Sequence, residues 1–201
     1  MKKSLLMLPL VLIASALALS ACGGGSSSSG GGDDEAAVEE AVEESATSTD
    51  PSKCTEFQTE AFNAQDQGVP AKEALKACEG AVEESETPAE SVNVSNVKID
   101  GETATADAQV EGSALNSQTV EIELAKEDGN WKLNKFLGFA EYDGKALAAA
   151  FEEELANQEE ITPGLAKCLA EGIAKMSQTE AEAMAFEQST EGIEGLVKTC
   201  Q

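Results

Sequence analysis

The sequence of 201 residues contains no histidine and no arginine; its 13 basic residues are all lysines, set against 38 aspartates and glutamates. The absence of histidine excludes Ser-His-Asp and Cys-His catalysis and histidine-ligated metal sites. The formal net charge of −25 excludes a basic patch that would bind nucleic acid or anionic lipid. We therefore expect no nucleic-acid partner, no catalytic residues, and neither a cofactor nor a bound metal.

The excess of acid has two interpretations. Clusters such as 33–35 and 152–154 supply carboxylate oxygens that suit divalent cations. No stretch, however, has the spaced Asp/Asn, Gly and terminal Glu of a calcium-binding loop. The composition therefore favours solubility or adaptation to salt as the role of the charge.

Residues 1–21 have the three parts of a secretory signal: the basic Lys2 and Lys3, an apolar stretch over 5–19, and small residues at the end. The order Leu19-Ser20-Ala21-Cys22 closes this segment. It resembles the lipobox of bacterial lipoproteins, in which the signal is cut before the cysteine and a diacylglyceryl group joins its sulfur.

The lipobox resemblance implies that residues 1–21 are removed and that Cys22 carries the lipid. The mature protein is then exported and anchored to the outer face of the cell membrane, or to an outer membrane if the host has one. An ordinary signal peptide cleaved after Ala21, which would leave Cys22 as a free thiol, is the alternative.

Residues 22–33 comprise the lipidated cysteine and a linker of glycine and serine that ends at the first aspartate. Such a segment has no side chains that can bury apolar area, and it behaves as a flexible coil. Ten residues of this kind have a root-mean-square reach of roughly 17 Å. We expect the folded part to remain close to the membrane surface.

Four further cysteines follow, at Cys54, Cys78, Cys168 and Cys200. An even number in an oxidising compartment predicts two disulfides, although four cysteines allow three connectivities. Pairing of neighbours, Cys54 with Cys78 and Cys168 with Cys200, is favoured because each pair lies within one helical block. A four-cysteine zinc site is disfavoured, because no two cysteines are two to four residues apart.

Hydrophobic periodicity divides the chain into three blocks. Apolar residues at helical spacing predict helices over 36–44, from 50 through 62, and from 70 to 82, with a turn at 65–68. Alternation then predicts strands over 92–99, 104–110, 120–124 and 131–137, with a bulge or break at 95–96. Turn signals lie at 100–101 and 127–130. From residue 143 the helical period returns.

The order of helices and then an antiparallel meander, closed by Asp128-Gly-Asn-Trp131-Lys-Leu133, resembles the nuclear-transport-factor-2-like domains of exported bacterial lipoproteins. The resemblance covers residues 34–137 and implies an α+β fold in which N-terminal helices pack on a curved antiparallel sheet, forming a cone. We assign residues 34–140 to this domain and residues 141–201 to a small, disulfide-linked, all-helical C-terminal appendix.

A cone of this type implies an interior that is either a ligand cavity or a filled core. The candidate residues for lining such a cavity are Phe57, Phe62, Ala106, Leu124 and Trp131. The alternative is that Ala104, Ala106 and Ala108 simply allow a helix to pack closely on the sheet.

The enzymatic members of that family rely on a buried Asp with Tyr or His partners. Here Asp107 is the one acid inside the predicted 104–110 strand, and alternation places it opposite the alanines. We therefore expect a non-enzymatic module of the bacterial envelope, which binds a small apolar ligand or an envelope protein. The resemblance is also compatible with a dimer. One alternative is an isomerase- or dehydratase-like enzyme that uses the cone, with Asp107 as base. The other is a purely structural acidic surface protein.

Overall fold

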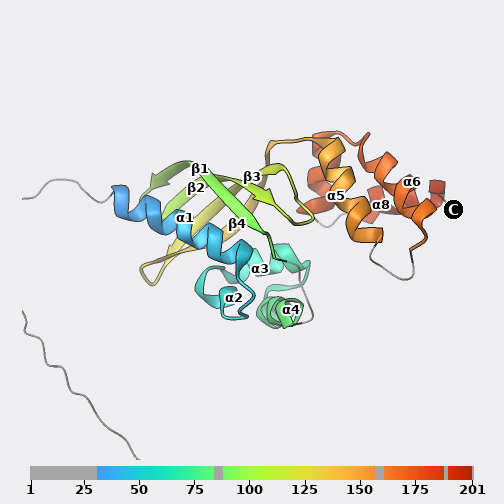
Figure 1. Ribbon diagram of the computed structural model, residues 1–201. Coiled ribbons are helices and arrows are strands. Elements are labelled where there is room, and N and C mark those ends of the chain that lie inside the picture. The colour runs from blue at the N-terminus through green and yellow to red at the C-terminus, as the bar shows by residue number, and fades with distance from the viewer. Residues whose placement is uncertain (1–30, 84–87, 157–160, 188–189, 201) are drawn as a thin grey trace, which may run out of the picture.

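The computed structural model describes residues 31–83, 88–156, 161–187 and 190–200. In these ranges four helices come first, four strands follow and four helices end the chain (Figure 1). The elements are α1 (Gly31–Thr47), α2 (Lys53–Glu56), α3 (Glu60–Gln67), α4 (Ala71–Glu83), β1 (Ser91–Asp100), β2 (Thr103–Glu111), β3 (Gln118–Glu127), β4 (Asn130–Glu141), α5 (Gly144–Ala156), α6 (Pro163–Ile173), α7 (Gln178–Ala185) and α8 (Thr190–Cys200). The predicted mixed α+β class, with helices before an antiparallel sheet, is confirmed.

The four strands form one antiparallel sheet in the order β1-β2-β3-β4. The predicted turn between β3 and β4 is present: Asp128 and Gly129 have φ of 53° and 87°, as a two-residue type I′ turn requires. The register of β1 shifts between Ser95 and Lys98, and Asn96 has a φ of 53°. The predicted irregularity is therefore a bulge within one continuous strand.

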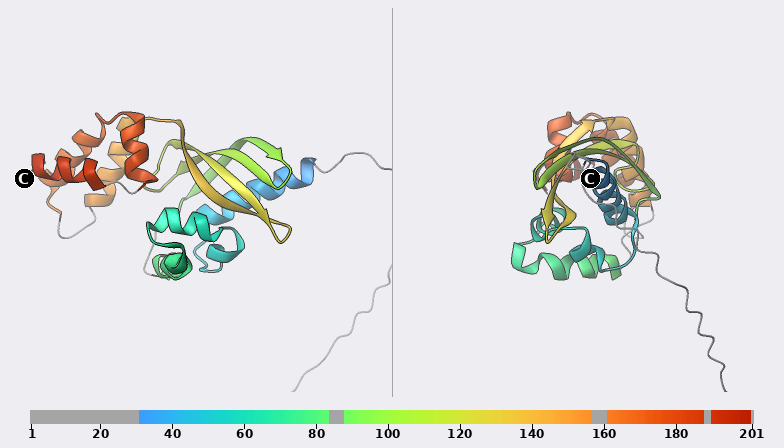
Figure 2. Two further views of the ribbon diagram at one scale, coloured as in Figure 1. Left: turned by 180° about the vertical axis from the view of Figure 1, so that it is seen from behind. Right: turned by 90° about the vertical axis from the view of Figure 1, so that its left-hand side faces the viewer.

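Helix α1 packs under the sheet, which curves over it (Figure 2). Val38 and Val42 are 0% and 1% exposed, because a spacing of four residues places them on one helix face. On β2, every second residue from Ala104 to Val110 is buried. These side chains belong to the same hydrophobic core, so the small alanines of β2 lie in the core between helix and sheet.

The prediction of one helix from residue 50 through 62 is wrong. The chain leaves the helix after α2 and runs beside β4: the Leu133 N–H donates to Phe57 O at 2.9 Å, and the Thr59 N–H donates to Leu133 O at 2.9 Å. The Thr59 hydroxyl then caps α3 by accepting from the Phe62 N–H. The edge of β4 thus supplies partners for backbone groups that a continuous helix would have paired internally.

The predicted turn at 65–68 lies too early, because α3 continues through Gln67. It ends at Gly68, which has a φ of 60°, a conformation that glycine adopts without steric cost. Helix α4 then begins at Ala71, directly after Pro70.

Both disulfides connect neighbouring cysteines, as predicted. Cys54 on α2 is bonded to Cys78 on α4, and Cys168 on α6 is bonded to Cys200 on α8. The first disulfide is buried, with both cysteines no more than 2% exposed. It holds the short α2, which has only four residues, to the longer α4.

The C-terminal helices gather at one end of the sheet, away from the start of α1 (Figures 1 and 2). Phe186, which follows α7, contacts the rings of Phe136 and Phe139 on β4. The Phe139 N–H donates to Glu182 Oε1 at 2.9 Å, and a Cβ on Gly138 would lie 2.7 Å from that oxygen. Side chains of α5, α6 and α7 share one core with the sheet.

Candidate groove between α1, α2 and β4

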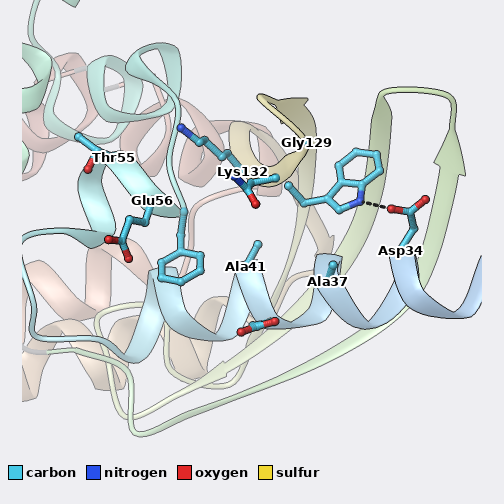
Figure 3. Close-up of a pocket in the computed structure, with 11 residues that line it drawn as sticks. Asp34, Ala37, Ala41, Thr55, Glu56, Gly129 and Lys132 are labelled. Atoms are coloured by element: carbon cyan, nitrogen blue, oxygen red, sulfur yellow. Dashed lines mark hydrogen bonds between the residues drawn. The ribbon is translucent and has the colours of Figure 1, made fainter. Parts of the chain in front are cut away.

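An open groove lies between α1, α2 and the turn that joins β3 to β4 (Figure 3). Its volume is about 460 Å³, within the range of about 300–1,000 Å³ that is usual for ligand pockets. Its walls are formed by Asp34, Ala37, Glu40 and Ala41 from α1, by Thr55, Glu56 and Phe57 from α2 and the residue after it, and by Gly129, Asn130, Trp131 and Lys132 from the turn and β4.

Each wall of the groove is held in place by a different part of the fold. The wall from α1 is fixed by Val38 and Val42 in the core. The wall from α2 is fixed by the Cys54–Cys78 disulfide and by the backbone hydrogen bonds of residues 57–59 to Leu133. The groove therefore lies where the short helix α2, held by its disulfide, meets the long helix α1 at the edge of the sheet.

Trp131 is one of the residues that line the groove, and its indole is held by Asp34. Its indole Nε1–H donates to Asp34 Oδ1 at 3.0 Å (Figure 3), and the Lys126 ammonium lies 2.5 Å from the same oxygen. The Lys126 Nζ also lies 5.2 Å from the centroid of the Trp131 ring, within the range of a cation–π contact. These hydrogen bonds, from Lys126 first and Trp131 second, lower the pKa of Asp34.

The lowered pKa of Asp34 predicts a pH-dependent contribution to stability. A carboxylate whose pKa falls on folding stabilises the native state above its ordinary pKa of about 3.9, and this contribution is lost as pH falls through the lower, folded value. Asp34→Asn should therefore be less stable than the wild type at pH 7 and at pH 5, and the difference should shrink below pH 3. Urea unfolding at several pH values measures it.

Asp33→Asn is the matched control, because it removes the same charge from an exposed neighbour on α1. It should change stability little at any pH. A difference between Asp34→Asn and the wild type that stays constant from pH 7 to pH 2 would contradict the role assigned to Asp34.

Acidic side chains line both helical walls. Glu40 on α1 and Glu56 on α2 are exposed, and neither forms an ion pair with another described residue. Lys132 lies 3.6 Å from Glu127. Ala37 and Phe57, which also line the groove, are half-buried and pack against the core. The groove thus combines an apolar floor with carboxylates that are open to a cationic partner.

The edge of β4 that lies away from β3 carries further backbone groups. Leu133 directs its N–H and C=O away from β3, toward residues 57–59. Because backbone groups alternate in direction along an antiparallel strand, and because the register is regular from Leu133 back to Trp131, Trp131 directs its N–H and C=O to the same side. No described backbone outside the sheet pairs with them.

Comparisons of this chain with known protein families, with curated proteins and with solved structures give no match. Across the described segments, no helix combines the length and the apolarity that a membrane span needs. No group of three or more Cys, Asp or Glu side chains suited to a metal ion is found in the same segments.

The structure separates the residues proposed to line a cone cavity. Phe62, Ala106 and Leu124 are buried in the core, with exposed fractions of 3%, 1% and 0%, and they line neither the groove nor a smaller hollow beside β1 and β2. Phe57 and Trp131 instead border the groove. Cys22, the proposed lipidation site, lies outside the described residues.

Asp107, the acid considered as a catalytic base, lies on the sheet face opposite Ala106 and Ala108, as alternation predicts. Its carboxylate accepts a hydrogen bond from the Asn96 amide at 2.7 Å. It is not part of the groove. Sequence reasoning missed Asp34, Glu40, Glu56 and Lys132 as a set, because three separate segments bring them together.

Proposed function

We propose that this chain is an exported lipoprotein, anchored through lipid on Cys22, that serves as a non-enzymatic interaction module of the bacterial envelope. The observation that carries the proposal is the Leu19-Ser20-Ala21-Cys22 order at the end of an apolar segment. The two disulfides support it, because disulfides persist mainly in oxidising compartments outside the cytoplasm.

For the folded part, we propose a nuclear-transport-factor-2-like cone over residues 34–140, followed by a helical appendix over residues 141–201. The helices before the sheet, the meander order and the curvature of the sheet over α1 support this assignment. Fold alone does not select a function.

The position of the groove supports binding over catalysis. It is lined in part by α1, the first described helix after Cys22 in the sequence. It holds carboxylates and an apolar floor. Asp107, the base in the enzymatic alternative, lies on another face of the sheet. These features suit a surface that receives a partner close to the membrane.

The anchor is tested by fractionation of bacterial cells that express the wild type or Cys22→Ala. Two acyl chains hold a protein stably on a membrane, since each buried methylene contributes about 0.8 kcal/mol. We expect the wild type in the detergent-extracted membrane fraction and Cys22→Ala outside it. Ser26→Ala, a substitution in the linker, is the matched control and should stay with the membrane. Retention of Cys22→Ala in membranes would refute the anchor.

A further inference from the structure

We propose that the groove binds an extended peptide segment of another envelope protein, rich in lysine or arginine, which adds a short strand to β4 at Trp131. The inference rests on the proposed role as an interaction module and names the chemistry of the partner. Three features of the groove support it: its carboxylates, its free backbone edge and its shape.

The first feature is charge. Glu40 and Glu56 stand on opposite walls, and neither has a cationic partner among the described residues. Asp34 is already occupied by Lys126 and Trp131. A basic partner would therefore meet two available carboxylates. A second copy of this chain is a poor occupant, because each copy has a formal net charge of −25 and like charges repel.

The second feature is the backbone edge. The chain itself already uses this edge once, where residues 57–59 pair with Leu133 in a parallel bridge. Two residues closer to the turn, Trp131 directs its N–H and C=O to the same side, away from β3, and it is one of the residues that line the groove. Addition of a strand at such an edge gives main-chain hydrogen bonds that do not depend on the partner's sequence, whereas side-chain sites give specificity.

The third feature is shape. The groove is partly open to solvent and not an enclosed cavity, so a chain segment can lie in it. Successive side chains of an extended segment point to opposite sides. Basic side chains on neighbouring residues can thus reach Glu40 on the α1 wall and Glu56 on the α2 wall, while aliphatic stems of lysine or arginine cover the apolar floor.

The test is titration calorimetry of the full chain in detergent micelles with the synthetic peptide Lys-Thr-Val-Lys-Thr-Val-Lys. The emission of Trp131, the chain's single tryptophan, is followed in a parallel titration. Glu40→Gln combined with Glu56→Gln should weaken binding by roughly three- to twenty-five-fold, since each exposed ion pair contributes up to about fivefold. The control pairs Glu39→Gln with Glu43→Gln, which removes two exposed charges of α1 outside the groove and should change affinity less than about twofold.

Two further probes separate strand addition from simple charge attraction. A peptide N-methylated at every backbone nitrogen keeps its charge but has no backbone N–H to donate from either edge, and it should bind at least roughly tenfold more weakly. Spermidine, a small cation without a peptide backbone, should not compete with the peptide at equal concentration.

Equal binding of the peptide to the two double variants would overturn the assignment to this groove. Equal binding of the N-methylated peptide, or full competition by spermidine, would overturn strand addition. Absence of peptide binding by a chain that fractionates with membranes through Cys22 would refute this inference and leave the proposed anchor intact, because the titration does not depend on the anchor.

Discussion

Leu124→Ala is expected to lower the free energy of unfolding by about 2–5 kcal/mol, the range seen when large aliphatic side chains are deleted from packed cores. Leu124 is 0% exposed on β3, and its strand neighbours in register are Ala104 and Leu133. Alanine at 104 cannot fill the space left behind, so a cavity should remain. Urea unfolding followed by circular dichroism measures the change.

The same substitution also distinguishes a filled core between helix and sheet from a hollow one. If the space beside Leu124 were a ligand cavity, the side chain would have fewer contacts to lose, and the cost would approach that of a surface site. Leu137→Ala on β4, where the leucine is 42% exposed, is the matched control and should cost no more than about 0.5 kcal/mol. Similar losses for the two variants would contradict a filled core.

Joint replacement of Cys54 and Cys78 by alanine is expected to lower the free energy of unfolding by about 3–4 kcal/mol. The two cysteines are 24 residues apart, and the chain-entropy model assigns about 3 kcal/mol to a loop of 15 residues and more to longer loops. Helix α2, with four residues, is too short to be stable without tertiary contacts. The wall that α2 contributes to the groove should therefore lose its fixed position, and peptide binding should be lost.

Joint replacement of Cys168 and Cys200 by alanine is the control for this effect. It should cost a similar amount of stability, because these cysteines are 32 residues apart, but they lie in α6 and α8, neither of which borders the groove. Peptide affinity should thus remain within about twofold of the wild type. Loss of binding in both double variants to the same extent would argue against a specific role for the α2 disulfide.

Much of the fold could be predicted from local patterns. The strands follow from alternation, as at Ala104 to Val110, and the turn at Asp128-Gly129 follows from residue types that tolerate positive φ. The disulfide pairing follows because each pair joins helices that are close in sequence. These features depend on a few neighbouring residues, which the sequence displays directly.

The split between α2 and α3 could not be predicted in this way. Phe57 and Thr59 leave the helix because they pair with Leu133, more than 70 positions further along, and no helical pattern reports such a partner. The groove is hidden for the same reason. Glu40 and Glu56 are two of 38 acids, and only the placement of α2 against α1 and β4 sets them apart.

Mass spectrometry of the chain extracted from the membranes of a bacterial host tests the central claim most directly. If the protein is an anchored lipoprotein, its N-terminal peptide begins at Cys22 and carries the mass of a diacylglyceryl group on that residue. An N-terminal peptide that begins at Cys22 with an unmodified thiol, or one that still contains Met1, would contradict the anchor. It would also contradict the proposal that the groove binds its partner at the membrane surface.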